Sequence, residues 1–239
     1  MKEKLQFCLD KISLIHSKLP KKKPHSEKYY KMIAFLNKYS LVFHFILACV
    51  LTFAIEVISR RDFLSTISFL HNHTLAYLYN AFIVFASLSI VYLFRCRAQL
   101  RVLISGLWLF LGTINGLILS NRVTPFSYTD LKCISDLFAM QNTNYFTAEE
   151  ATLVVGVVVA FFVFLGFFFA KGPKYQGKRH FVLGPVSIAA LLLVGLPITT
   201  QAAQGSNILA SYFSNIAQGY ADYGFVYGFS TSVVAVSYT

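Results

Sequence analysis

Five long apolar stretches constrain this chain more than any other feature of its sequence, and Glu56 is the one ionised side chain inside them. Because the hydrocarbon core of a bilayer, roughly 30 Å thick, takes about 20 helical residues, each stretch is long enough to cross a membrane once. Backbone groups inside lipid must pair within their own segment, so we expect all five to be helices. The stretches are Ser40–Ile58, Leu75–Phe94, Val102–Ser120, Ala151–Ala170 and Phe181–Thr199.

Composition and the placement of charge indicate the same class of protein. The chain is 56% hydrophobic and 13% charged, which lies outside the usual range for soluble domains. Its net charge of +11 raises the question of a nucleic-acid partner. The basic residues, however, gather before the first stretch, between the second and third, and between the fourth and fifth, as the positive-inside rule requires. We therefore expect a multi-pass cell-membrane protein with a cytoplasmic N-terminus, an extracellular C-terminus and no nucleic-acid partner.

The expected organisation has three parts, 1–39, 40–199 and 200–239. In the first, leucine and isoleucine at helical spacing before Pro20 predict an amphipathic helix on the inner leaflet, followed by a basic linker that includes Lys28 and Lys31. The second is a five-helix transmembrane domain. Between its third and fourth helices, Leu131, Ile134 and Phe138 share one helical face and predict a short interfacial helix.

The third part, 200–239, is expected to be an extracellular linker, because its apolar character falls. An apolar stripe from Ile208 to Ile216 predicts a helix that Gly219 ends, and 226–236 has a strand-like pattern. About forty residues cannot bury a core of their own, so this tail needs a partner surface.

The sequence contains no motif of a soluble catalytic site. A phosphate-binding Gly-Lys-Ser loop, a Gly-x-Ser-x-Gly elbow and a His-Glu-x-x-His helix are all absent. His71 and His73 form only a weak candidate metal pair, because they have no third ligand nearby. No two cysteines share an oxidising side of the membrane, so no disulfide framework is expected; they are Cys8, Cys49, Cys96 and Cys133.

Glu56 is notable because a carboxylate at the centre of a membrane helix costs roughly 2.5–3.5 kcal/mol and is usually paired or functional. Arg60, four residues on, shares its helix face and permits an ion pair. Alternatively, Glu56, Arg60 and Arg61 together hold a polar lipid headgroup at the outer interface, since guanidinium groups suit phosphate. Asn80 and Asn115, inside the second and third stretches, are expected to find hydrogen-bond partners on other helices.

The sequence NGLILSNRVTPFSYTD, from Asn115 to Asp130, is more specific than a pattern of apolar or charged residues. With five spans and an outward C-terminus, it resembles the membrane domain of the lipoteichoic acid synthase-like group of the sulfatase superfamily. Members of that group carry an Asn and aliphatic run, then Arg-x-Thr-Pro-Phe and an acidic residue. The tail GYADYGFVYGFS, 219–230, is similar to the linker of these proteins. The matching motif residues are Asn115, Arg122, Thr124, Pro125, Phe126 and Asp130.

The resemblance implies a transferase that moves glycerol phosphate from phosphatidylglycerol to an envelope polymer. In that group the threonine nucleophile and its divalent metal belong to an extracellular domain, so neither a catalytic residue nor a cofactor is assigned to this chain, and the chain alone is not expected to be active. We expect the chain to be the membrane module of a longer protein, which anchors that domain and presents an anionic, phosphatidylglycerol-like lipid to it. Arg122 is the expected headgroup contact, or else it snorkels at the end of the third span.

Two other classes of function remain open. A small multi-pass transporter or channel usually shows paired intramembrane charges, broken helices or internal repeats, and none is evident in the sequence. The other alternative is a non-catalytic scaffold that binds envelope-synthesis partners through its helices, which is favoured if no catalytic domain follows Thr239.

Overall fold

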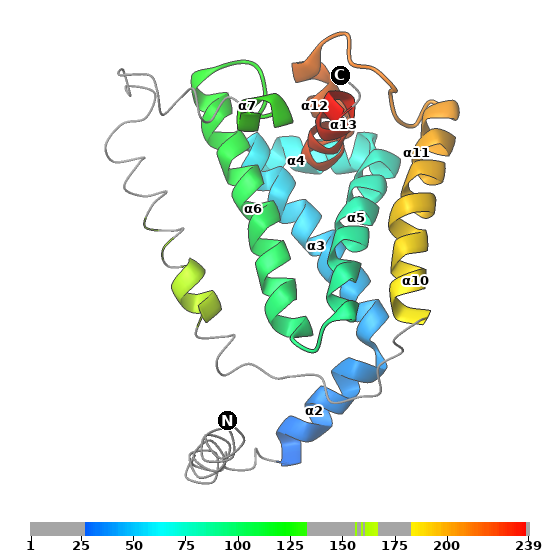
Figure 1. Cartoon of the computed structure of the whole chain (residues 1–239). Helices are drawn as coiled ribbons and strands as arrows, with labels where there is room; N and C mark the ends of the chain where they lie inside the picture. Colours follow the sequence, from blue (N-terminus) through cyan, green and yellow to red (C-terminus); the bar gives the residue numbers. More distant parts are fainter. Residues whose placement is uncertain (1–26, 133–155, 157–158, 160, 167–182, 238–239) are drawn as a thin grey trace, which may run out of the picture. The chain divides into compact units, whose positions relative to one another are not determined.

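The computed structural model describes residues 27–132, 156, 159, 161–166 and 183–237 (Figure 1). These residues form helices and, within the described ranges, no strand, in agreement with the predicted all-helical class. The chain divides into two units, Met1–Phe43 and His44–Thr239. In the first unit, helix α2 (Glu27–Lys38) occupies part of the segment predicted to be a linker. A Lys31–Glu27 ion pair of 2.7 Å, one helical turn apart, and Lys38 in the last turn favour the helix there.

Among the described residues, four helices are long and apolar enough to cross a membrane, and they correspond to the first, second, third and fifth predicted stretches. The chain is therefore compatible with a membrane protein, and these four helices are called the candidate spans. They are α3 (Ser40–Arg60), α5 (Thr74–Ser89) with the 3-10 helix η1 (Ile90–Leu93), α6 (Arg97–Asn121), and α10 (Leu183–Ala190) with the π-helix η2 (Leu191–Gly195) and α11 (Leu196–Gly205).

Some predicted elements lie outside the described residues. These are the N-terminal amphipathic helix and most of the fourth stretch, of which only 156, 159 and the helical segment 161–166 are described. The predicted interfacial helix after the third stretch is described only as α7 (Tyr128–Lys132), so Ile134 and Phe138 also lie outside.

The fifth stretch forms a longer helix than predicted. It was expected to end at Thr199, but the helix continues through α11 to Gly205. Pro197 is one of the first two residues of α11, directly after the π-helical turn η2. A π-turn changes the local hydrogen-bonding pattern, so the missing proline N–H does not end the helix.

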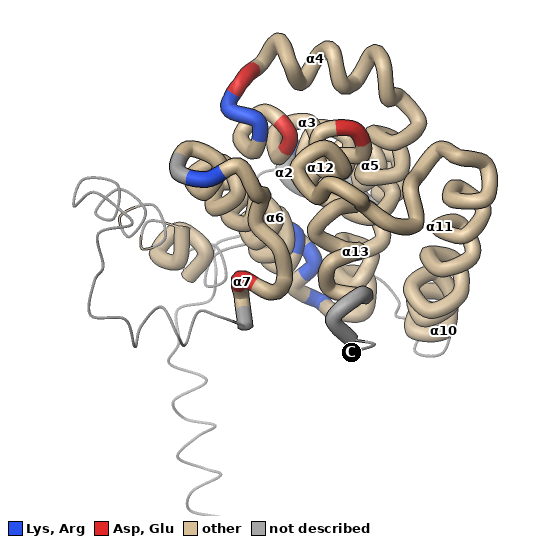
Figure 2. Tube along the Cα trace, turned by 90° about the horizontal axis from the view of Figure 1, so that it is seen from above, with Lys and Arg blue, Asp and Glu red and all other residues tan. Residues whose placement is uncertain are grey.

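A helix that the sequence did not predict, α4 (Phe63–Asn72), joins α3 to α5. Asp62 caps it, because its carboxylate accepts hydrogen bonds from the backbone N–H groups of Leu64 at 3.0 Å and Ser65 at 3.1 Å. The end of the bundle where α3 ends and α5 begins is called the hairpin end. Figure 2, which looks onto this end, shows α4 lengthwise along one edge of it.

The C-terminal helices α12 (Ile216–Tyr223) and α13 (Phe225–Ser237) are joined at Gly224 and form a helical hairpin, which gives this end its name and is called the hairpin (Figure 1). The strand-like prediction for 226–236 is wrong, because α13 is helical throughout that range. The prediction that Gly219 ends a helix is also wrong. Asn215 caps α12 by accepting hydrogen bonds from the N–H groups of Ala217 and Gln218, so the helix starts at Ile216 and passes through Gly219.

The main apolar core lies between the candidate spans, the loop after α6 and the hairpin. Half of its ten buried members come from that loop and the hairpin, so the tail finds its partner surface on the spans of its own chain. The members are Ala48, Leu51, Ile55, Val84, Leu88, Phe126, Tyr220, Phe225, Val226 and Phe229.

Candidate functional site at the hairpin end

Glu56 is the centre of a buried polar cluster at the hairpin end, where its side chain is 1% exposed. Its Oε2 accepts a hydrogen bond from Arg60 Nε at 2.9 Å, so the predicted ion pair one turn apart is confirmed. Its Oε1 accepts a hydrogen bond from the backbone N–H of Phe225 at 2.7 Å. Phe225 is the first residue of α13, and a carboxylate there satisfies an N–H without a helical partner and complements the helix dipole.

Arg60 serves the other helix of the hairpin. Its guanidinium donates to the backbone carbonyl oxygens of Ala221 at 2.8 Å and Tyr220 at 3.5 Å, in the last turn of α12. The same guanidinium stacks over the ring of Phe69 on α4, 4.2 Å from its centroid. A cation near the C-terminus of a helix is favourable, so Glu56 and Arg60 together cap both helices of the hairpin.

Asn80 on α5 holds the turn of the hairpin from the other side and is fully buried. Its Nδ2 donates to the carbonyl oxygen of Tyr223 at 2.7 Å, and its Oδ1 accepts from the N–H of Tyr227 at 2.6 Å. The predicted interhelical partners of Asn80 are thus backbone groups on both sides of Gly224. Three polar side chains of two candidate spans therefore hold one short turn.

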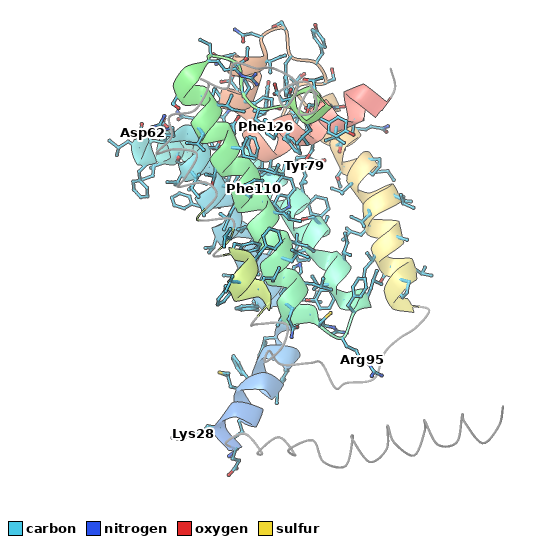
Figure 3. All side chains as sticks on the ribbon, turned by 60° about the vertical axis from the view of Figure 1, so that its left-hand side comes forward. Lys28, Asp62, Tyr79, Arg95, Phe110 and Phe126 are labelled. Carbon is cyan, nitrogen blue, oxygen red and sulfur yellow. The ribbon has the colours of Figure 1, made fainter. Side chains whose placement is uncertain are left out.

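Asn115 on α6 plays the equivalent role for the loop that follows this helix. It is 1% exposed, donates from Nδ2 to Ser59 Oγ at 2.6 Å, and accepts from the N–H of Phe126 at 2.6 Å. Phe126 stacks on Phe229 of α13 with the ring centroids 5.7 Å apart. Figure 3 shows Phe126 at the hairpin end, opposite the end at which Arg95 lies.

Arg122 closes this loop on itself. Its guanidinium donates to Asp130 Oδ2 at 2.7 Å, to the carbonyl oxygen of Thr124 at 2.9 Å and to that of Pro125 at 3.3 Å. Asp130 Oδ2 also accepts from the N–H of Ser127 at 2.8 Å. All six residues of the sequence motif thus belong to one hydrogen-bonded loop, residues 122–130, and its anchor Asn115; this loop is called the motif loop.

The Arg122–Asp130 pair gives a pH-dependent prediction. Partial burial acts to raise the pKa of Asp130, but hydrogen bonds from Arg122 and Ser127 outweigh it and hold the pKa below its usual value. A lowered folded-state pKa means that the pair stabilises the folded chain above about pH 4 and that this contribution is lost as the pH falls through the folded-state pKa.

For a partly exposed pair we expect a loss of at most about 1 kcal/mol. The free energy of unfolding, measured in detergent from pH 7 down to acid, should fall more for the unsubstituted chain than for Asp130→Asn. Parallel curves for the two proteins would show that Asp130 contributes nothing to the acid sensitivity.

A cavity of about 240 Å³ lies beside the buried polar cluster. This is smaller than the roughly 300–1,000 Å³ of sites for drug-sized ligands, so it has room for a small group only. Its walls come from α3, α4, α6, the motif loop and the hairpin. The lining residues are Glu56, Ser59, Arg60, Ser65, Asn115, Leu119, Val123, Pro125, Ala217, Tyr220, Ala221 and Phe225.

The structure brings two of the four predicted headgroup residues to this cavity. Glu56 and Arg60 line it, while Arg122 lies in the motif loop and Arg61 is exposed in the turn after α3, with φ of +57°. Sequence reasoning did not assign Ser59 or Gly224 to the site. Gly224 could have been found from the sequence, because it lies between two aromatic-rich runs. No feature of the sequence marks Ser59.

Among the described residues, no group of three or more His, Cys, Asp or Glu side chains is placed to hold a metal ion. No protein-family model, curated protein or solved structure matches the chain. The function is therefore inferred from the geometry of the hairpin end and from the sequence motifs.

Proposed function

We propose that this chain is the membrane module of a lipoteichoic acid synthase-like phosphoglycerol transferase. In this proposal it anchors an extracellular catalytic domain in the cell membrane and presents to it an anionic lipid similar to phosphatidylglycerol. The observation that carries the proposal is that the two segments on which the resemblance rests contact each other. Tyr128 in the first donates its N–H to Ser232 Oγ at 2.9 Å, next to the second, and Phe126 stacks on Phe229.

The anchoring part of the proposal is supported by the way the hairpin is held. Phe225, Val226 and Tyr227 are at most 1% exposed, and side chains of α3 and α5 hold the turn before them. A domain that follows α13 would then start from a fixed point at the membrane surface. With the N-terminus in the cytoplasm, that point lies outside the cell. A fixed start restricts the orientations of the domain relative to the lipid, which favours reaction.

The lipid-presenting part is supported by the cavity and the side chains near it. Arg60, Ser59 and Ser65 line the cavity, and the exposed Arg61 follows Arg60 directly. Guanidinium groups bind phosphate well. Because Glu56 neutralises Arg60, these walls favour a headgroup that carries hydroxyls as well as a phosphate. Arg122 would have to leave Asp130 before it could bind a headgroup, so Arg61 is the better candidate.

A transporter remains the second candidate, and one observation favours it. The Glu56–Arg60 pair within a candidate span, next to two short helices that meet at Gly224, resembles the broken helices and paired charges of transporter sites. Here, however, Glu56, Arg60 and Asn80 all bond to the backbone of the hairpin. That use of the polar groups favours a structural clamp over a transport site.

The proposal is tested by following labelled glycerol from phosphatidylglycerol into envelope polymer in cells that lack the chain. Loss of the chain should remove most of the labelled polymer, and the unsubstituted full-length protein should restore it. Arg61→Gln should restore it only in part, whereas Lys28→Gln, on the exposed helix α2, should restore it fully. Undiminished labelling in cells that lack the chain would overturn the proposal, and accumulation of a small solute would favour the transporter.

A further inference from the structure

Helix α4 buries only part of its surface against the rest of the chain. Thr66 and Phe69, three residues apart, are 1% and 3% exposed and form its inward face. Three large apolar residues of the same helix are exposed, Phe63 by 55%, Leu64 by 75% and Ile67 by 43%. Exposed apolar surface of this kind at the end of a candidate span needs a partner.

The exposed surface of α4 has two different flanks. At about 100° per residue, Phe63, Leu64 and Ile67 lie within an arc of about 100°, in which the exposed His71 of the last turn also lies. Ser68 and Asn72 are exposed on the other flank, where Asn72 Nδ2 donates to Ser68 Oγ at 3.2 Å. This division into an apolar and a polar flank is typical of a helix that lies at a membrane surface.

A ring contact shows which way the apolar flank faces. Phe63 packs edge-on against Phe53 of α3, with the ring centroids 5.9 Å apart. Phe53 lies seven residues before Arg60, about 10 Å back along the candidate span. The apolar flank therefore faces along α3 toward the middle of this candidate span. The polar flank faces in the opposite direction, away from the middle of the span.

If the candidate spans cross a membrane, the span ends beside α4 mark its boundary. Candidate spans end at Arg60 and begin at Thr74, on the two sides of α4. On the next span, Leu75 is 58% and Leu78 is 45% exposed, so apolar surface continues from α4 onto α5.

We infer that α4 is an interfacial helix whose Phe63, Leu64 and Ile67 flank inserts into the glycerol and acyl region of the bilayer, while Ser68 and Asn72 face water. The occupant of this surface is lipid. The inference is independent of the proposed transferase function, because it needs only a chain that lies in a membrane. It also connects lipid to the site, since Phe69 of α4 stacks on Arg60 and Ser65 lines the cavity.

Tryptophan placed on each flank tests the inference. Ile67→Trp and Asn72→Trp are compared in a Trp108→Phe background, in vesicles of phosphatidylcholine and phosphatidylglycerol that contain lipids brominated high on the acyl chains. The Ile67→Trp emission should be blue-shifted and quenched about twofold more by these lipids than that of Asn72→Trp, as for an apolar face at the acyl boundary. Aqueous iodide should show the opposite order.

Equal quenching of both tryptophans by iodide would overturn the inference, and so would equal quenching of both by brominated lipid, since the helix would then have no water-facing flank. Because Trp108 donates to Ser87 Oγ, its replacement can affect folding. A photoreactive phospholipid that labels the unsubstituted full chain avoids this. Label on Phe63, Leu64 and Ile67 but not on Ser68 and Asn72 supports the inference, and label on neither set overturns it.

Discussion

Replacing Glu56 with leucine should lower the free energy of unfolding by about 3–5 kcal/mol, the range for removing one partner of a buried ion pair. The substitution leaves the guanidinium of Arg60, whose side chain is 16% exposed, without its carboxylate. It also leaves the N–H of Phe225, which is 1% exposed, without an acceptor. The hairpin should detach in part, and exchange of the backbone N–H groups of Phe225 and Tyr227 with deuterium should accelerate.

Two other substitutions separate the possible causes. Glu56→Gln keeps an acceptor for Phe225 N–H and removes only the charge, so its effect should be smaller. Glu27→Leu removes the carboxylate of an exposed pair with Lys31, and should change stability by less than about 1 kcal/mol. Unfolding is followed by circular dichroism as denaturing detergent is titrated into micelles. Equal effects of Glu56→Leu and Glu27→Leu would show that the buried pair does not hold the hairpin.

The candidate spans were predictable because the constraint on them is local. An apolar stretch of about 20 residues is readable from composition alone, and α3, α5 with η1, and α6 begin and end within a few residues of the predicted limits. Helix α4 was not predicted, because its ten residues mix an inward face with two exposed flanks of different polarity. No single period of apolar residues marks such a helix.

The hairpin was mispredicted because distant contacts determine it. The β-branched residues after Val226 have a strand-like pattern, but the first N–H groups of α13 are accepted by Glu56, 169 residues away, and by Asn80, 147 residues away. These caps favour a helix over the local preference for a strand. The Glu56–Arg60 pair was predictable from its spacing, whereas the partners of Asn80 and Asn115 depend on which segments meet.

Gly224→Ala should destabilise the chain by about 3 kcal/mol or more, because the backbone conformation and the available space at this position both require glycine. Gly224 has φ of +89° and ψ of 160°, a region that residues with a side chain rarely adopt. A Cβ atom there would lie 2.8 Å from Glu56 Oε1 and 2.9 Å from Asn80 Nδ2. Neither atom can retreat without losing its hydrogen bond to the hairpin backbone.

The matched control is Gly205→Ala, at the end of α11, where a Cβ atom would meet nothing within 4 Å. This change should be neutral or stabilise the chain by a few tenths of a kcal/mol, because alanine restricts the unfolded chain. Brief chymotrypsin treatment in micelles distinguishes the two. Cleavage after Phe225 or Tyr227 should accelerate strongly in Gly224→Ala and not in Gly205→Ala, because undocking exposes those aromatic residues. If both variants resist cleavage as the unsubstituted protein does, the turn tolerates a side chain and the clamp formed by Glu56 and Asn80 is looser than these contacts indicate.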